Sequence, residues 1–162
     1  MAHRKNGNAC LAYITDLPRR ARYPFVFQGT FSMVAKDTVR DDFAIWESDN
    51  PIPFFDKLAE NVSFIVRGRL NPLAGHYNSR SQVLEVFQRL SSGFTAPPTC
   101  KVTNIFVDGD GAVVEMSLDA MTKSGYNFYE DLCFVCKYAG NSIVEVRIYV
   151  DTAAEIKLMS EA

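Results

Sequence analysis

The chain has 162 residues, of which 48% are hydrophobic and 12% aromatic, and its formal net charge at pH 7 is -2. This length suits one domain with a sizeable core and is short for two ordinary domains. The small net charge provides no broad attraction to nucleic acid or to an anionic membrane surface, so neither is expected as the main partner.

The cysteine pattern predicts structural thiols. The four cysteines, Cys10, Cys100, Cys133 and Cys136, lack the spacing of zinc ligands. Cys133 and Cys136 form a C-x-x-C, but they lie in a strand pattern, where residues three apart point to opposite faces. Unpaired thiols are typical of a reducing compartment. No apolar run approaches the roughly 20 residues of a membrane span, so a cytoplasmic protein is expected.

Residues 1–30 are predicted to be a partly ordered extension in front of a domain that covers residues 31–162, because they are basic and show no sustained period. From Phe31 to Trp46 the apolar residues follow a helical period, and Asp42 lies near the centre of the apolar stripe. A buried carboxylate needs a hydrogen-bonding partner, a polar cavity or a raised pKa. Alternatively, a rotated helix would leave Asp42 at its solvent edge.

The remaining elements are predicted from proline and glycine breaks and from the hydrophobic period. A short helix from Pro53 to about Glu60 precedes a strand from Val62 to Arg69, and a helix covers about Arg80 to Leu90. All later segments are predicted to be β: strands at 100–107 and 112–122, then a long hairpin from Tyr126 to Asp151. Helices followed by antiparallel strands indicate the α+β class.

The hairpin has unequal faces. Leu132, Phe134 and Cys136 share one side of its first strand, and Tyr129, Asp131, Cys133 and Val135 share the other. Asp131 is thus an acid in the middle of a strand.

This order of elements is accompanied by several specific stretches. They are Val66-x-Gly68-x-x-x-Pro72-Leu73-Ala74-Gly75-x-Tyr77, Ala112-Val113-Val114-Glu115, Tyr129-Glu130-Asp131, and Ile143-Val144-Glu145-Val146-Arg147-x-Tyr149-x-Asp151-Thr152-Ala153. Together they resemble the SnoaL-like, ketosteroid isomerase-related group of the nuclear transport factor 2-like (NTF2-like) superfamily, over about Phe31 to Met159. The resemblance implies a cone-shaped, curved antiparallel sheet wrapped around the N-terminal helices, with one pocket.

The strand at 112–122 can be interpreted in two ways. Its alternation alone predicts that Glu115, Ser117 and Asp119 face water. The resemblance instead implies that these residues line the concave, pocket side. The apolar face would then need cover from another sheet, which favours a homodimer through the outer sheet face.

The resemblance also implies roles for acids. Asp131 matches the strand position of the protonated aspartic acid in the oxyanion hole of ketosteroid isomerase, and Asp42 falls close to that enzyme's hydrogen-bonding tyrosine. The general-base aspartate has no counterpart, because Ile65–Arg69 contains no carboxylate. Steroid isomerisation by that mechanism is therefore not expected, and Asp131, Glu115 and Asp42 are the predicted catalytic carboxyls.

Further residues are predicted to bind substrate. Trp46, Phe64 and Tyr129 would line an apolar pocket or belong to the ordinary core, and His76 lies in a loop that would rim the pocket mouth. Ile148 and Val150 would supply apolar wall. The predicted binding residues are Trp46, Phe64, Arg67, His76, Ser117, Asp119, Tyr129, Cys133, Ile148 and Val150.

These residues predict a cofactor-independent, metal-free isomerase, cyclase or rearrangement catalyst that acts on a small apolar molecule such as a polyketide, terpenoid or alkaloid. The scheme requires Glu115 and Asp131 to line a cavity. The alternative is a non-catalytic ligand-binding or dimerising module. A third alternative, epoxide or lactone hydrolysis, requires the side chain of Arg67 to point inward.

Overall fold

The computed structural model describes residues 33–48 and 50–160, so the predicted extension at 1–30 lies outside the described residues. The elements in chain order are α1 (Lys36–Ala44), the 3-10 helix η1 (Ile45–Glu47), α2 (Ile52–Phe55), β1 (Leu58–Val66), β2 (Gly75–Tyr77), α3 (Arg80–Ser91), β3 (Thr99–Asp108), β4 (Gly111–Met121), β5 (Asn127–Ala139), β6 (Ser142–Tyr149) and α4 (Thr152–Ser160).

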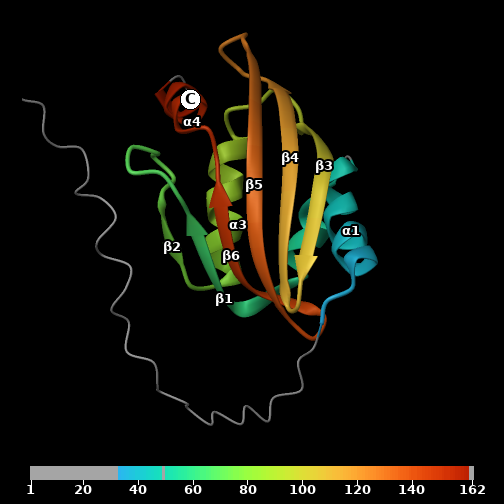
Figure 1. Ribbon diagram of the computed structural model, residues 1–162. Coiled ribbons are helices and arrows are strands. Elements are labelled where there is room, and N and C mark those ends of the chain that lie inside the picture. The colour runs from blue at the N-terminus through green and yellow to red at the C-terminus, as the bar shows by residue number, and fades with distance from the viewer. Residues whose placement is uncertain (1–32, 49, 161–162) are drawn as a thin grey trace, which may run out of the picture. The chain divides into compact units, whose positions relative to one another are not determined.

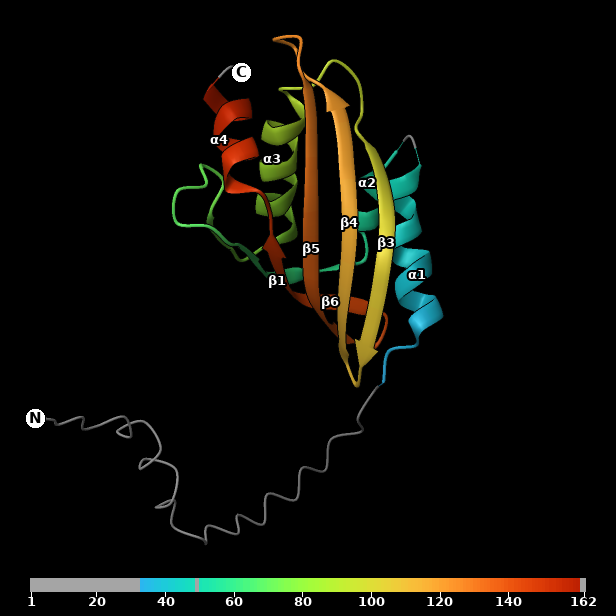
Figure 2. The same cartoon turned by 45° about the horizontal axis from the view of Figure 1, so that its top comes forward.

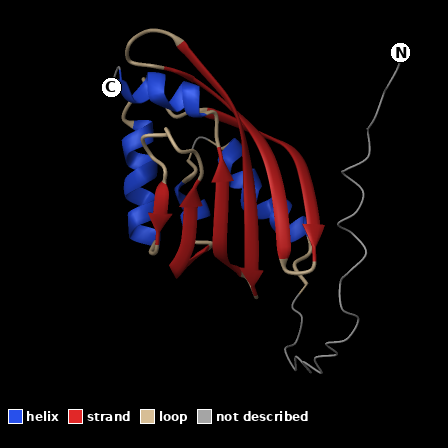
Figure 3. Ribbon diagram, turned by 60° about the vertical axis from the view of Figure 1, so that its left-hand side comes forward, coloured by secondary structure: helices blue, strands red, loops and turns tan. Residues whose placement is uncertain are grey.

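One curved six-stranded sheet carries the domain, in the order β2-β1-β6-β5-β4-β3. Helices α1 and α3 lie against its concave face, and α4 lies near one end of α3 (Figures 1, 2 and 3). The predicted α+β class and curved sheet are confirmed. The expectation of a purely antiparallel sheet is corrected, because β1 pairs with β6 in parallel. These two strands are far apart in sequence, so no short hairpin forces them to be antiparallel.

The predicted hairpin is present. Strands β5 and β6 pair antiparallel and close where Ala139 faces Ser142, with Gly140 at a φ of 60° in the turn. A left-handed backbone of this kind is one that glycine adopts without steric cost. On β5, Phe134, Cys136 and Tyr138 are buried and their neighbours are more exposed, as the alternation predicts.

Two predicted boundaries are wrong. The second helix ends at Phe55, and β1 already begins at Leu58, which pairs with Ile143 of β6. Pairing within the sheet overrides the local helical preference of this segment. Helix α4 is absent from the prediction, although Asp151 Oδ1 accepts the N–H of Ala153 at 2.9 Å and so caps its start.

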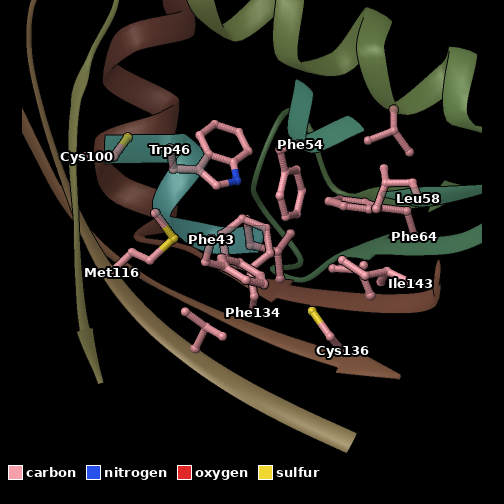
Figure 4. Packing of buried hydrophobic residues seen from close by; sticks show 14 of the residues in the cluster. Phe43, Trp46, Phe54, Leu58, Phe64, Cys100, Met116, Phe134, Cys136 and Ile143 are labelled. Carbon is pink, nitrogen blue, oxygen red and sulfur yellow. The ribbon is translucent and has the colours of Figure 1, made fainter. Parts of the chain in front are cut away.

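The core between helices and sheet is aromatic (Figure 4). Phe43 of α1 meets Phe54 and Phe134 edge to face, with ring centroids 5.0 and 5.2 Å apart. Trp46 packs against Phe54 at 5.2 Å and Phe87 at 5.3 Å. Such contacts fix ring positions as well as burying apolar area, so this cluster holds α1, η1, α2 and α3 on the sheet.

Asp42 is buried, as the helical period predicts, and is 2% exposed. Lys57 Nζ lies 2.8 Å from its Oδ1, and the Tyr138 hydroxyl donates to its Oδ2 at 3.4 Å. The sequence allowed a hydrogen-bonding partner, a polar cavity or a raised pKa for this carboxylate, and in the structure it has partners. Asp42 therefore links α1 to the start of β1 and to β5.

We expect Lys57→Met to destabilise the protein by about 2 kcal/mol, because it leaves the Asp42 carboxylate buried without its cation. This is below the loss expected for a fully buried pair, since the Lys57 side chain is 42% exposed. Chemical denaturation measures the free energy of unfolding. Lys123→Met, at an exposed lysine without an ion pair among the described residues, is the control and should change it by less than about 0.5 kcal/mol. Equal losses in both variants would contradict this role for Asp42.

Candidate functional site

A cavity of about 40 Å³ lies between the concave face of the sheet and helices α3 and α4. Its exposed walls are apolar, and two acidic residues, Glu130 and Glu155, are among the residues that line it. The other lining residues are Trp46, Val66, Leu73, Val86, Phe87, Leu90, Cys100, Met116, Leu118, Leu132, Phe134, Ile148 and Val150. Apolar walls with a few converging polar groups are typical of small-molecule sites.

Glu130 is on β5 and shares the inner face of that strand with Phe128 and Phe134. It is 2% exposed, and its Oε1 accepts the backbone N–H of Asp151 at 2.7 Å. Burial raises the pKa of Glu130 to about 8, with a further contribution from the charge of Glu155, and the hydrogen bond from Asp151 partly offsets this rise. The carboxyl is therefore mostly protonated at neutral pH.

Glu155 reaches the cavity from α4. It is 2% exposed, and its Oε2 is buried without a hydrogen-bond partner among the described residues. Burial raises the pKa of Glu155 to about 7. A substantial fraction of this carboxyl is thus ionised at neutral pH, and one of its oxygens has no hydrogen-bond partner among the described residues.

The position of α4 depends on two glycines. A Cβ on Gly93, after α3, would lie 2.7 Å from Leu158 Cδ1, and a Cβ on Gly68 would lie 2.7 Å from Thr152 Oγ1. At both positions a larger residue would require the neighbouring side chain of α4, Leu158 or Thr152, to move. These close approaches let α4 seat Glu155 at the cavity.

The arrangement can move protons. Two carboxyls with raised pKa values share one apolar space, and the value for Glu130 is the higher. Groups that titrate near the working pH are the most effective general acids and bases. Glu130 is suited to donate a proton and Glu155 to accept one.

The predicted pair Glu115 and Asp131 does not line this cavity. Both are exposed on the outer face of the sheet, where they border one open hollow of about 550 Å³. Glu115 Oε2 accepts from Asn104 Nδ2 at 2.7 Å, and Asp131 accepts from the Tyr129 hydroxyl at 2.9 Å. Both acids border the same hollow, but it lies on the convex side of the sheet. The predicted acid/base scheme required them to line the cavity, and they do not.

The same correction applies to four predicted binding residues. Ser117, Asp119, Tyr129 and Cys133 have the parity of the outer face, and Tyr129 is 58% exposed. The inner face of β4 is instead formed by its apolar residues, Ala112, Val114, Met116, Leu118 and Ala120. The alternation of this strand gave the correct orientation, and the register transferred from the resemblance was wrong by one residue.

Some of the other predicted residues line the cavity and others lie outside it. Trp46, Ile148 and Val150 line the cavity, and their role in binding stays a prediction. Phe64 is core, with its ring 6.0 Å from that of Phe87. The lining of the cavity does not include Asp42.

Arg67 and His76 lie outside the cavity. Arg67 is exposed, so the inward orientation that the hydrolase alternative required is absent. His76 is on β2 and not in a loop, is exposed, and its Nε2 lies 2.9 Å from Ser63 Oγ.

Sequence reasoning missed both cavity carboxyls, although each has a signal. Glu130 has the parity of Phe128, Leu132 and Phe134, so it is the acid on the apolar side of β5. Glu155 and Leu158 are three residues apart in a segment that begins with the cap at Asp151, a spacing that places them on one helical face.

Cys100, Cys133 and Cys136 are free thiols, and Cys133 and Cys136 point to opposite faces of β5. In the described ranges 33–48 and 50–160, no group of three or more His, Cys, Asp or Glu side chains could hold a metal ion. Over the same ranges no helix combines the length and hydropathy needed to cross a membrane. Cofactor independence and a cytoplasmic location stay predictions.

No protein-family model matches the chain, and a search of curated proteins gives no match either. Solved structures do share its architecture. An NTF2-like protein from Burkholderia thailandensis is 20% identical, with a TM-score of 0.66 over 76% of this chain and 95% of that one. A putative SnoaL-like polyketide cyclase from Jannaschia is 18% identical, with a TM-score of 0.62 over 78% of this chain and 91% of that one.

A third protein, with a ketosteroid isomerase-like fold, comes from Catenulispora acidiphila and was solved in complex with trimethylamine. It is 14% identical and has a TM-score of 0.62 over 78% of this chain and 95% of that one. Similarity at these identities shows the fold and leaves the activity to the site. The curved α+β sheet and these neighbours show that the chain has the nuclear transport factor 2-like fold.

Proposed function

We propose that the protein is a cofactor-independent isomerase or cyclase for a small, mostly apolar natural-product-like molecule, such as a polyketide, terpenoid or alkaloid. Glu130 and Glu155 act as its acid/base pair. The proposal is based on two buried glutamates with raised pKa values that are among the residues lining one apolar cavity. One carboxyl oxygen, Glu155 Oε2, also has no hydrogen-bond partner among the described residues. The structural similarity to a putative SnoaL-like polyketide cyclase supports the reaction class.

The proposed chemistry begins with proton transfer next to a carbonyl. Ionised Glu155 removes a proton from the carbon beside the carbonyl through Oε2, while protonated Glu130 donates a proton to the carbonyl oxygen. The product is an enol, and Glu155 now carries the proton that the carbon lost. Where the substrate has a double bond between its β and γ carbons, the enol is a dienol; return of the proton from Glu155 to the γ carbon, with return of the enol proton to Glu130, moves the double bond into conjugation with the carbonyl without a net change in protons.

The alternative is a carrier that binds such a molecule without changing it. The absence of a counterpart to the general-base aspartate of ketosteroid isomerase in Ile65–Arg69 favours it. The experiments below distinguish the two. Hydrolysis of epoxides or lactones is not proposed, since Arg67 is exposed.

We also propose that a second copy of the chain covers the outer face of the sheet. Phe106 on β3, Tyr129 on β5 and Tyr149 on β6 are 59%, 58% and 46% exposed on this face. Half-buried Val113 and Val135 lie beside Phe106 in the same row of the sheet and border a hollow with it. Aromatic and aliphatic side chains in this density favour a protein interface.

The acid/base pair is tested by hydrogen exchange of a ketone in deuterated buffer. We expect the protein to accelerate exchange at the carbons beside the carbonyl of 4-pentylcyclohexanone, followed by proton NMR. Glu130→Gln and Glu155→Gln should each slow the exchange at least about tenfold, since general acid/base groups typically contribute more than this.

Glu115→Gln and Asp131→Asn are matched controls, because they change acids on the outer face and should leave the exchange rate unaltered. Loss of exchange in these variants, with full activity in the Glu130 and Glu155 variants, would contradict the proposed pair. Binding of the ketone without any exchange above buffer in the unmodified protein would favour the carrier.

The raised pKa values predict a pH dependence of stability. A carboxyl whose pKa is higher in the folded than in the unfolded chain stabilises the fold at low pH, and this stability is lost as the pH rises towards 7 and 8. Glu130→Gln keeps the acceptor for the Asp151 N–H and cannot ionise. From the pKa of about 8 we therefore expect it to raise the free energy of unfolding by about 4–5 kcal/mol at about pH 8.5 and by about 1 kcal/mol at about pH 5.

Thermal unfolding of Glu130→Gln at both pH values, with Glu115→Gln as the control, measures this difference. A gain of the same size at both pH values, or a gain at low pH alone, would show that Glu130 is not a buried, protonated carboxyl.

The dimer is tested by light scattering after size-exclusion chromatography. We expect a mass of twice 18.2 kDa for the unmodified chain and 18.2 kDa for Phe106→Lys, because a lysine at this position places a charge in the proposed interface. Leu70→Lys changes an exposed residue in the loop after β1 and should keep the larger mass. A monomeric unmodified protein would overturn the proposal.

A further inference from the structure

A second apolar hollow lies on the far side of Trp46 from the carboxyls. It is a groove of about 370 Å³ between the segment at Trp46–Phe55 and the C-terminal half of α3. Ile52 and Phe55 border it from α2, and Leu84 and Ser91 from α3. None of the residues that line this groove carries a charge.

The groove and the cavity have a common wall. Four residues, Trp46, Phe87, Leu90 and Leu118, line both spaces. The rings of Trp46 and Phe87 form the aromatic part of this wall, with centroids 5.3 Å apart at an interplanar angle of 47°. The side chains of these four residues therefore belong to the boundary between the groove and the cavity.

The wall and the cavity also hold unsatisfied polar atoms. Trp46 Nε1 and Glu155 Oε2 are both buried without a hydrogen-bond partner in the described part of the chain. A buried donor and a buried acceptor without partners each carry a cost: a ligand oxygen could accept from Trp46 Nε1, and a ligand hydroxyl could donate to Glu155 Oε2. These two atoms are therefore candidates for contacts with a polar group of a ligand, one in the shared wall and one beside the cavity.

The cavity and the groove differ in volume. The cavity alone, at about 40 Å³, is far smaller than the roughly 300–1,000 Å³ of ordinary small-molecule sites, whereas the groove, at about 370 Å³, falls within that range. A molecule with one oxygen-bearing end and an apolar body fits the pair of spaces, with its oxygen among the carboxyls and its body in the groove.

We infer that the groove and the cavity are one binding site for an elongated apolar molecule with a carbonyl or hydroxyl at one end, and that the side chains of Trp46 and Phe87 move apart to admit it. The inference deepens the proposed function by giving its substrate a shape and an orientation. The oxygen-bearing end meets Glu130 and Glu155, and the apolar body runs past Trp46 between η1, α2 and α3.

The site is tested by binding of cyclohexanone and its 4-methyl, 4-propyl and 4-pentyl derivatives to the full chain. Trp46 is the only tryptophan in the sequence, so its emission reports directly on the wall between the two spaces. We expect the affinity to rise about fourfold for each methylene that enters the groove, as for burial of apolar surface.

Ser91→Phe fills the groove from α3 and touches no residue that carries the proposed proton transfer. We expect it to remove the dependence on chain length, so that the 4-pentyl derivative binds no more tightly than cyclohexanone. The matched control is Arg89→Phe, an exposed position two residues earlier on the same helix, which faces away from the groove and should keep the full series. Thermal unfolding of both variants verifies that they fold.

The outcomes separate this inference from the proposed function. Equal chain-length dependence in Ser91→Phe and the unmodified protein, or none in either, would overturn the groove as a binding site. Hydrogen exchange on unsubstituted cyclohexanone would still be lost in Glu155→Gln if the acid/base pair is correct. Conversely, chain-length dependence that only Ser91→Phe removes supports the groove even when the unmodified protein gives no exchange above buffer.

Discussion

Two carboxyl groups share an apolar cavity in which no cation pairs with either of them among the described residues. Burial of an unpaired carboxylate is costly, and the molecule avoids that cost by holding a proton, which is why the pKa values of Glu130 and Glu155 rise. The contrast with Asp42 is instructive. Asp42 is equally buried but has Lys57 and the Tyr138 hydroxyl as partners, and this satisfied group links structural elements.

The last helix determines whether this cavity exists. Asp151 connects the two carboxyls through the backbone, because its N–H binds Glu130 while its side chain caps the helix that carries Glu155. Gly68 and Gly93 let that helix approach closely enough to close the space. A short segment after β6 thus contributes both Glu155 and the backbone N–H that binds Glu130. Function in this fold depends on such local additions to a common sheet.

Much of the fold could be predicted from the sequence, and the site only in part. The period of α1 placed Asp42 inside, and the alternation of β4 and β5 placed each side chain on the correct face. The resemblance implies instead that Glu115 and Asp131 line the pocket. In the structure both lie on the outer face, as the alternation predicts. A shift of one residue in a strand exchanges its two faces completely. Glu130, the neighbour of Asp131, is the acid on the inner face of β5.

Other features depend on contacts that a single sequence does not contain. The parallel pairing of β1 with β6 and the close approach of α4 to Gly93 join segments that are far apart in the chain. The common wall of groove and cavity depends on how Trp46 and Phe87 pack. Residue types and spacing identify candidates for such contacts, but the contacts that form depend on how the side chains pack.

The central claim is that Glu130 and Glu155 hold protons near neutral pH. Carbon-13 NMR of the side-chain carboxyl carbons across the pH range measures this directly, with Glu130→Gln and Glu155→Gln used to assign the signals. We expect two glutamate signals to titrate near pH 8 and pH 7. Titration of both near the ordinary glutamate value of about 4.3 would contradict the account.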